Sequence, residues 1–325
     1  MKRQPNQRKA AIGKIAEGIE AEHGNVLRRI KEVEYLGTGI RALDWALGRG
    51  LPVGRMTEVF GEFATGKSVL GLQLAAKVQR EGGVSIVVDS ERRFSVSMAK
   101  ALGIDTEEVI YIPGTCLEET YDRMATAVAK AREHFDGDIY LMWDSLGSTQ
   151  SRDEMEGKVD LGGQRGRRAY ANSVGLAKMT PLIDDCRVAF YMVNQLRVKP
   201  DVVYGKTWYT MGGKAPEFYS TVQVMLSKGK EIEGERREIV GQRGKLRVVK
   251  NTVAPPFRGF EFELFFDRGI PEESGWVDTL VQRGLVIVSG GWCYVNADKE
   301  KRKFRKADIV KFLAEHPELE KVVTG

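Results

Sequence analysis

Apolar and amphipathic segments alternate through the middle of the chain. Residues 56–60 and 85–91 are rich in apolar and β-branched side chains, as are strands that are buried on both faces. Between them, residues 68–83 carry apolar side chains at the spacing of a helix. The alternation continues through predicted strands at 109–112, 138–145 and 188–195, a short helix from residue 96 and a helix at 117–135. This order predicts an α/β fold with a mostly parallel central sheet and helices on both faces.

Three later apolar segments follow one another without helices between them. They are residues 218–226, 244–253 and 260–266. Because neighbouring strands that are joined without a crossover helix pair antiparallel, we expect an antiparallel extension at one side of the sheet.

The pattern divides the chain into three predicted regions. Residues 1–32 carry eight Lys and Arg against four Glu and part of a helical apolar stripe, Ile12, Ile15, Ile19, Val26 and Ile30. They predict a helical arm that contacts a neighbouring subunit or packs on its own domain. Residues 33–270 form the alternating core. Residues 271–325 predict a small α/β domain, with a hairpin turn at Ser289-Gly290-Gly291 and a final helix over 307–323.

Composition narrows the class of protein. The 325 residues include 50 Lys and Arg against 45 Asp and Glu, and this small positive charge does not by itself establish a nucleic-acid partner. Three widely spaced cysteines and three histidines argue against a disulfide scaffold and a zinc site. The chain has no secretory signal and no apolar run of about 18 residues, so we expect a cytoplasmic protein.

A complete GxxxxGK[ST] loop joins the first core strand to the first core helix. It consists of Gly61, Glu62, Phe63, Ala64, Thr65, Gly66, Lys67 and Ser68, and continues into Val69. Its glycines let backbone N–H groups converge on a phosphate at a helix N-terminus. Lys67 is expected to reach the β- and γ-phosphates of ATP, and the Ser68 hydroxyl to ligate Mg²⁺. The strand before the loop and the helix after it favour this function over a fortuitous turn.

Polar side chains end three further predicted strands. Asp144 stands where a carboxylate can hold Mg²⁺, although it can also cap the next helix. Glu91 can orient the water that attacks the γ-phosphate, and the spacing does not decide between it and Asp89. Gln195 is either a sensor of the γ-phosphate or an ordinary amide at a strand end.

Several ordered motifs make the chain resemble the RecA recombinase family. They are TGIRALDWALGRGLPVGRMTEVFGEFATGKS, VVDSER, WDS, EMEG, NQLRVK, MGGKAPEFYSTV and VVKNTVAPPF. The resemblance covers most of the chain and implies a RecA-like P-loop NTPase core. It further implies a DNA-dependent ATPase that forms helical filaments on single-stranded DNA and catalyses pairing and strand exchange with homologous duplex DNA.

The resemblance also implies roles for single residues. Glu91 matches the family's catalytic glutamate, Asp144 its Walker-B aspartate and Gln195 its switch between ATP and DNA. Lys250 matches a lysine that reaches the ATP of the neighbouring subunit. Two aromatic residues match positions at the nucleotide of the neighbour and at the subunit contact, respectively Phe266 and Phe218. In such a homo-oligomer, ATP lies between protomers.

Some positions depart from the family pattern. Thr252 replaces a second lysine that reaches across the subunit contact. Met98 stands where bacterial members have an aromatic ring over the adenine, and it is expected to cover the base less rigidly. The sequence ends LEKVVTG, without the acidic tail of bacterial members. These departures suggest a divergent relative, encoded by a bacteriophage or a mobile element, with weaker restraint on DNA access.

Two segments match the family's DNA-binding loops. Residues 156–168 are Gly-rich and then basic, and their predicted DNA contacts are Arg165, Arg167 and Arg168. Residues 197–214 mix cations, aromatics and glycines, and their predicted contacts are Arg197, Lys199, Tyr204, Gly212 and Gly213. The basic run 299–306 is either a second site for duplex DNA or a solvated charged surface.

Two other functions remain open at this point. A ring-forming RecA-fold motor, such as a helicase, shares the same nucleotide residues but needs a further loader-binding domain, which is not apparent in the sequence. A recombination mediator would bind ATP as a structural ligand only. The joint presence of Lys67, Ser68, Glu91 and Asp144 favours a protein that hydrolyses ATP.

Overall fold

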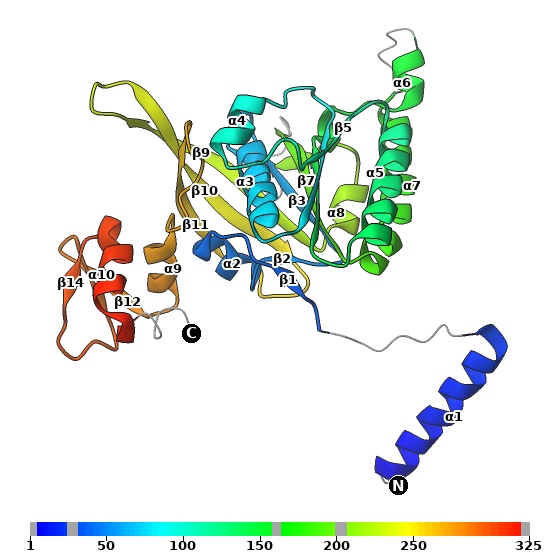
Figure 1. Ribbon diagram of the computed structural model, residues 1–325, viewed down its shortest axis with the longest axis horizontal. Coiled ribbons are helices and arrows are strands. Elements are labelled where there is room, and N and C mark those ends of the chain that lie inside the picture. The colour runs from blue at the N-terminus through cyan, green and yellow to red at the C-terminus, as the bar shows by residue number, and fades with distance from the viewer. Residues whose placement is uncertain (1–4, 25–31, 158–163, 199–206, 320–325) are drawn as a thin grey trace. The chain divides into compact units, whose positions relative to one another are not determined.

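The computed structural model describes residues 5–24, 32–157, 164–198 and 207–319. The contacts divide the chain into two units, residues 1–34 and residues 35–325. The second unit contains the central sheet, the helices that cover it and a smaller sheet near the C-terminus (Figure 1).

The central sheet is mostly parallel, which confirms the predicted fold class. Its strand order is β11-β10-β9-β3-β7-β6-β4-β5, and β8 pairs with β7 at one end. The strands are β3 Arg55–Gly61, β4 Val84–Asp89, β5 Ile110–Pro113, β6 Ile139–Asp144, β7 Val188–Val198, β8 Trp208–Thr210, β9 Val222–Glu233, β10 Ile239–Asn251 and β11 Gly259–Phe265. All pairs from β9 through β3 to β5 are parallel, so β3, β4, β6 and β7 end at the same edge.

Two apolar cores lie on opposite faces of this sheet. One face is covered by α2 Arg41–Leu47, α3 Lys67–Arg80 and α4 Val96–Ala101, and the other by α5 Leu117–His134 and α7 Gln164–Asp185 (Figure 1). Successive residues of β6 alternate between the cores, with Tyr140 and Met142 in one and Leu141 and Trp143 in the other. Burial on both faces explains why these strands are apolar throughout.

The predicted antiparallel extension is present. β9 is parallel to β3 on one side and antiparallel to β10 on the other, and β10 pairs antiparallel with β11. Short elements complete the core, namely β1 Tyr35–Leu36, β2 Leu51–Pro52, η1 Leu146–Ser148, α6 Arg152–Glu156 and α8 Ala215–Tyr219.

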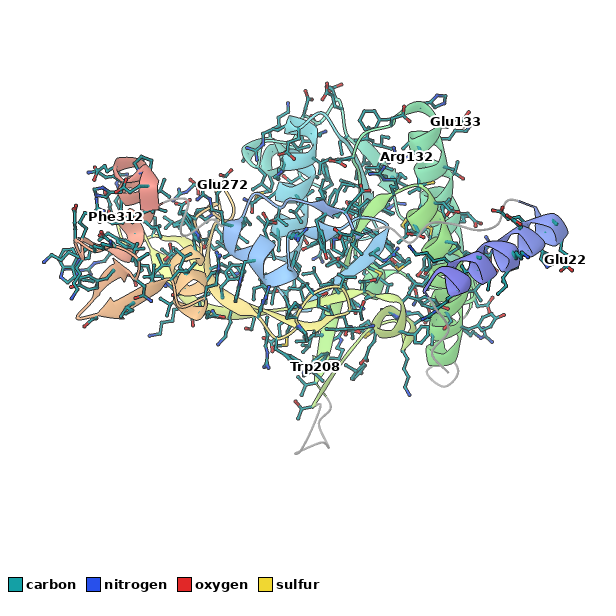
Figure 2. The ribbon with its side chains drawn as sticks, turned by 90° about the horizontal axis from the view of Figure 1, so that it is seen from below. Glu22, Arg132, Glu133, Trp208, Glu272 and Phe312 are labelled. Carbon is teal, nitrogen blue, oxygen red and sulfur yellow. The ribbon has the colours of Figure 1, made fainter. Side chains whose placement is uncertain are left out.

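Residues 271–325 belong to the second unit and have an apolar cluster of their own. The elements are α9 Trp276–Gln282, β12 Val286–Ser289, β13 Trp292–Val295, β14 Lys303–Phe304, η2 Lys306–Asp308 and α10 Ile309–Glu315. Phe312 of α10 stacks on Phe304 of β14 in this cluster (Figure 2). The β12–β13 hairpin turns at Gly290 and Gly291, as predicted, and both have positive φ.

The prediction of one continuous final helix over 307–323 was wrong. α10 ends at Glu315, and His316 has φ −134° and ψ 67°. Pro317 disfavours the helical conformation at the residue before it, which explains the interruption.

The first unit contains α1, Pro5–His23. Its isoleucines at positions 12, 15 and 19 are 56%, 62% and 37% exposed. Their spacing places them along one side of the helix, as predicted.

 Val26 and Ile30, the other two members of the predicted stripe, lie outside the residues that the structure describes.

None of the helices in the described part of the chain combines the length and the apolar character that crossing a bilayer requires.

Candidate active site

The phosphate-binding loop lies between β3 and α3, at the edge where the parallel strands end. The chain leaves β3 at Gly61, where a Cβ would overlap the backbone oxygen of Leu226 in β9. It enters α3 through Gly66, whose φ of +90° lies in the left-handed region. Both positions therefore require glycine. From β10, the Gln242 side-chain amide donates to the carbonyl of Ala64 and holds the loop in place.

The Lys67 ammonium group lies inside this loop and is buried. Its Nζ donates to the carbonyl oxygens of Gly61 at 3.1 Å and Glu62 at 2.6 Å. Burial lowers the pKa of Lys67, while the carboxylates of Asp144, Glu91 and Glu62 raise it. A buried cation that donates to neutral oxygens favours an anion beside it, and a phosphate fits this position.

Asp144 ends β6 next to the start of α3. The Ser68 hydroxyl donates to its carboxylate, and Asp89 of β4 is its partner in the strand register. The pKa of Asp144 is raised to about 6, chiefly by burial and also by the carboxylates of Glu91 and Asp89, while Ser68 and Lys67 act to lower it. A hydroxyl and a carboxylate at this point fit Mg²⁺, which proteins often bind through one or two ligands together with phosphate oxygens.

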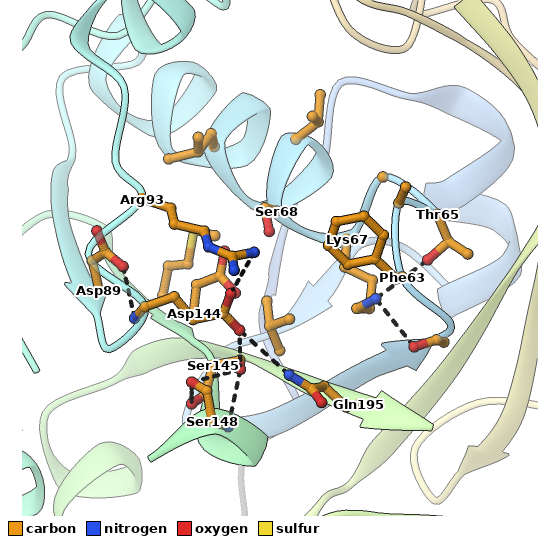
Figure 3. Close-up of a pocket in the computed structure, with 18 of the residues that line it drawn as sticks. Phe63, Thr65, Lys67, Ser68, Asp89, Arg93, Asp144, Ser145, Ser148 and Gln195 are labelled. Carbon is orange, nitrogen blue, oxygen red and sulfur yellow. Dashed lines mark hydrogen bonds and ion pairs between the residues drawn. The ribbon is translucent and has the colours of Figure 1, made fainter. Parts of the chain in front are cut away.

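Glu91 receives donors from three directions. The Ser145 hydroxyl donates to its Oε1 at 2.9 Å, and the Gln195 amide lies 3.5 Å from the same oxygen. On the other side, the Arg93 guanidinium lies 3.2 Å from Oε2. Gln195 within β7 and Ser145 directly after β6 therefore both contact this carboxylate, as Figure 3 shows.

Asp89, the competitor of Glu91, has a different environment. Its carboxylate accepts the backbone N–H groups of Glu91 at 3.0 Å and Phe94 at 2.8 Å, and the Tyr111 hydroxyl at 3.1 Å. These bonds shape the turn after β4. Because its carboxylate oxygens already stabilise this turn, Asp89 is the weaker candidate for orienting water, and Glu91 is the stronger one.

These groups surround one cavity of about 630 Å³, a suitable size for a nucleotide. The predicted residues that line it are Gly61, Phe63, Ala64, Thr65, Gly66, Lys67, Ser68, Val69, Glu91, Asp144 and Gln195. The lining also includes polar and aromatic side chains that the sequence did not identify, among them Arg93, Phe94, Ser145 and Ser148. These four lie within four residues after Glu91 or Asp144, so their position after two strand ends was the available signal.

Several residues that were predicted to contact the nucleotide do not line this cavity. Met98 packs against the apolar core below α4, while Phe94 lines the cavity. Lys250 Nζ donates to the carbonyls of Glu217 at 2.7 Å and Phe218 at 3.3 Å. Phe266 is 50% exposed. Glu62 contributes its carbonyl to Lys67.

The first predicted DNA-binding segment is partly helical. The expectation of a loop through residue 168 was wrong, because α7 begins at Gln164. Arg167 NH1 lies 3.6 Å from Asp153, and the largely buried Arg168 Nε lies 3.1 Å from Glu154. Residues 158–163 and the side chain of Arg165 lie outside the described part of the structure.

The second predicted DNA-binding segment begins as a strand. Arg197 is in β7, lines the nucleotide cavity and pairs in register with Tyr209 of β8. Gly212 and Gly213 have φ of +91° and +84°, and a Cβ on either would crowd α7 or its neighbours. This packing explains both glycines without a phosphate contact. Lys199 and Tyr204 lie within residues 199–206, outside the described part.

The basic run 299–306 makes several contacts within the C-terminal region. Arg302 lies 2.9 Å from Asp298, and Lys306 lies 2.6 Å from Asp278. Lys303 and Arg305 lie over the ring of Trp292, at 4.5 Å and 3.9 Å from its centroid. Through these contacts, the basic side chains help to hold the elements of the C-terminal region together.

Comparison with known proteins gives consistent matches. The family model described as the RecA N-terminal domain matches residues 10–271. Protein RecA of Bdellovibrio bacteriovorus is 35% identical over 292 residues, which cover 89% of this chain and 74% of that protein. Protein RecA of Geobacter sulfurreducens is 30% identical over 327 residues, which cover 98% and 94%. Protein RecA of Aquifex aeolicus is 34% identical over 289 residues, which cover 89% and 81%.

Proposed function

The chain belongs to the RecA family, and we propose that it is an ATP-dependent recombinase acting in DNA recombination and repair. In this proposal it forms helical filaments on single-stranded DNA and catalyses pairing and strand exchange with homologous duplex DNA. It uses ATP and Mg²⁺ and works in the cytoplasm.

One arrangement carries the proposal. Lys67, Glu91 and Gln195 line the same cavity, with Ser68 and Asp144 between them. Gln195 belongs to β7, which ends at Val198, and residues 199–206 of the segment predicted to bind DNA follow next in the sequence. A cavity residue on the strand that precedes this segment supports an ATPase whose nucleotide state controls DNA binding.

Each residue in the cavity has a proposed task. Lys67 binds the phosphates, and Ser68 and Asp144 hold Mg²⁺, which neutralises phosphate charge when it is bound. Glu91 accepts a hydrogen bond from water and orients it for attack on the γ-phosphate. Ser145 and Arg93 fix the Glu91 carboxylate through the contacts described above. Gln195 senses the γ-phosphate and transmits its presence along β7.

We further propose that the site is completed by a second copy of the chain. Lys250, Phe218 and Phe266 are not among the residues that line the cavity, and the two aromatic side chains are 75% and 50% exposed. In a filament, Lys250 of one protomer reaches the nucleotide of the next. The exposed isoleucines of α1 suit a role for the arm in the same assembly.

The DNA contacts are proposed on the same basis. Arg167 and Arg197 are exposed, so they can neutralise phosphates of the DNA backbone. Arg165, Lys199 and Tyr204 belong to the same two segments. Arg168 is a weaker candidate because its guanidinium already pairs with a buried carboxylate.

The experiment that tests this function is the substitution Glu91→Gln. The amide keeps the size of the side chain but is a poor base, so turnover should fall by about 10² to 10⁴-fold. Binding of single-stranded DNA in the presence of ATP should remain within about threefold of the parent protein. Glu107→Gln, an exposed acidic side chain outside the cavity lining, is the matched control.

The alternatives give different results. A mediator that uses ATP only as a structural ligand would show no loss of turnover in Glu91→Gln. A ring-forming motor would lose turnover too, but the parent protein would unwind or move along DNA and would not exchange strands between homologous molecules. A strand-exchange assay on the parent protein therefore separates the recombinase from the motor.

A further inference from the structure

A fully buried glutamate, Glu58, lies in the middle of β3, the strand that leads into the phosphate-binding loop. Glu58 is 0% exposed, in a strand that also buries Met56, Val59 and Phe60. Its Oε1 accepts the Asn194 side-chain amide at 2.7 Å, and its Oε2 accepts the Gln223 side-chain amide at 2.5 Å. The Thr210 hydroxyl donates to the same carboxylate. Burial raises the pKa of Glu58, and the three donors oppose this effect because they stabilise the carboxylate.

The Asn194 side of this network leads to the nucleotide sensor. The Asn194 Oδ1 accepts the backbone N–H of Gln195 at 2.8 Å, and its Nδ2 also donates to the carbonyl of Met211 at 2.9 Å. The N–H of Met211 in turn donates to the carbonyl of Gln195 at 3.2 Å. The position of Gln195 is therefore tied to Glu58 through one side chain.

The Thr210 donor brings in the strand that follows the DNA segment. Thr210 belongs to β8, which pairs antiparallel with β7 directly after residues 199–206. Trp208 of the same strand packs against Phe60 of β3, with ring centroids 4.8 Å apart (Figure 2). β8 is thus held to β3 at Thr210 and at Trp208.

The Gln223 side leads toward the proposed subunit contact. Gln223 of β9 is the register partner of Glu58 on one side and of Lys250 in β10 on the other. The three residues form a row across adjacent strands. Burial lowers the pKa of Lys250, and the carboxylates of Glu217 and Glu58 act to raise it.

We propose that Glu58 is a positioning residue that couples the nucleotide sensor Gln195 to β8 and to Lys250. Its carboxylate holds three donors from three different strands in one arrangement. A shift of Gln195 when the γ-phosphate is bound or lost changes that arrangement and moves β8. This inference rests on the proposed function, because it assigns the means by which ATP controls DNA affinity.

A purely structural role is the competing explanation. Buried polar groups are usually satisfied by hydrogen bonds, and a satisfied network can serve only the specificity of folding. The two explanations differ in one property: a positioning role changes the dependence of DNA binding on the nucleotide, whereas a structural role changes only stability.

The test measures a coupling ratio, defined as the Kd for a labelled oligo(dT) with ADP divided by the Kd with a non-hydrolysable ATP analogue. In Glu58→Gln, an NH₂ group replaces one of the two carboxylate oxygens. It then faces a side-chain N–H₂ donor and loses that hydrogen bond. We expect the coupling ratio to fall by about tenfold, with the Kd for the nucleotide itself within about twofold. A ratio within about twofold of the parent protein would overturn the proposal.

The double substitution Glu58→Gln with Gln223→Glu supplies the rescue. It exchanges the acid and the amide between β3 and β9, so each amide again meets an acceptor. The coupling ratio should return to within about threefold of the parent value. A double variant that folds normally but does not recover the ratio would contradict transmission through these hydrogen bonds.

Two further measurements keep the test decisive. If Glu58→Gln does not fold, Thr210→Val removes one donor with little change in volume, and the ratio should fall by about threefold; an unchanged ratio overturns the proposal. Trp208 emission, assigned by subtraction with Trp208→Phe, should respond to the ATP analogue without DNA and lose this response in Glu58→Gln. If the Trp208 emission of the parent protein responds to the analogue while its coupling ratio is close to one, the recombinase function fails. Transmission from Gln195 to β8 through Glu58 is then retained, and its link to DNA affinity is overturned.

Discussion

Asp144→Asn should stabilise the nucleotide-free protein while it removes a proposed ligand of Mg²⁺. The raised pKa of Asp144, about 6 against the ordinary value of 3.8, means that the ionised side chain destabilises the folded state. The difference corresponds to about 3 kcal/mol at pH 7. The asparagine oxygen can still accept the Ser68 hydroxyl, so we expect a net gain of about 1–3 kcal/mol and a rise in Tm of a few degrees.

The sign of the pH dependence follows from the same shift. Below pH 3.8 the aspartate is protonated in both the folded and the unfolded chain, and it has no destabilising effect. As the pH rises from there to about 6, the unfolded chain ionises first, and the contribution of Asp144 to stability falls. The advantage of the variant should therefore be largest above pH 6 and reduced to about half at pH 5.

Thermal unfolding at pH 5 and at pH 7, followed by circular dichroism without nucleotide, measures this effect. Asp89→Asn is the matched control, because Asp89 is the register partner of Asp144 and its carboxylate accepts two backbone N–H groups. This control should lose about 1–3 kcal/mol. A lower Tm for Asp144→Asn at pH 7, or a difference that does not change with pH, would refute the reasoning.

Three further predictions follow from single contacts. Lys250→Ala should reduce DNA-stimulated ATP turnover by about 10²-fold in a steady-state assay; full turnover would exclude a second protomer from the site. Ser145→Ala removes the hydroxyl that donates to Glu91 and should lower kcat by about tenfold without a change in ATP affinity, measured by calorimetry. The hydrogen bond from Arg302 lowers the pKa of Asp298 to about 2, so its stabilising effect is present above pH 4 and is lost as the pH falls toward 2. Asp298→Asn should accordingly lower the Tm at pH 7, with a difference that shrinks in acid.

The nucleotide site could be predicted because its residues follow local rules. The loop from Gly61 to Ser68 has a fixed spacing, and Glu91 and Asp144 end apolar strands. Parallel strands carry such ends to one edge, so the sequence order alone brings these residues together. The position of Gln195 beside Glu91 followed for the same reason.

Contacts between distant elements were not predictable in this way. Arg168 is one of three arginines in a basic segment, and its pairing with Glu154 depends on how α6 lies against α7. Glu58 interrupts an apolar strand, but its partners come from β7, β8 and β9. The end of α10, in contrast, was available from the sequence, because Pro317 follows His316.

In the proposed function, the ATP site is completed by a neighbouring protomer, and hydrolysis is stimulated when protomers assemble on DNA. Steady-state ATP hydrolysis, measured with and without single-stranded DNA at several protein concentrations, tests it most directly. The account predicts strong stimulation by DNA and a rate that rises cooperatively with protein concentration. A rate that is independent of DNA and proportional to protein concentration would contradict it.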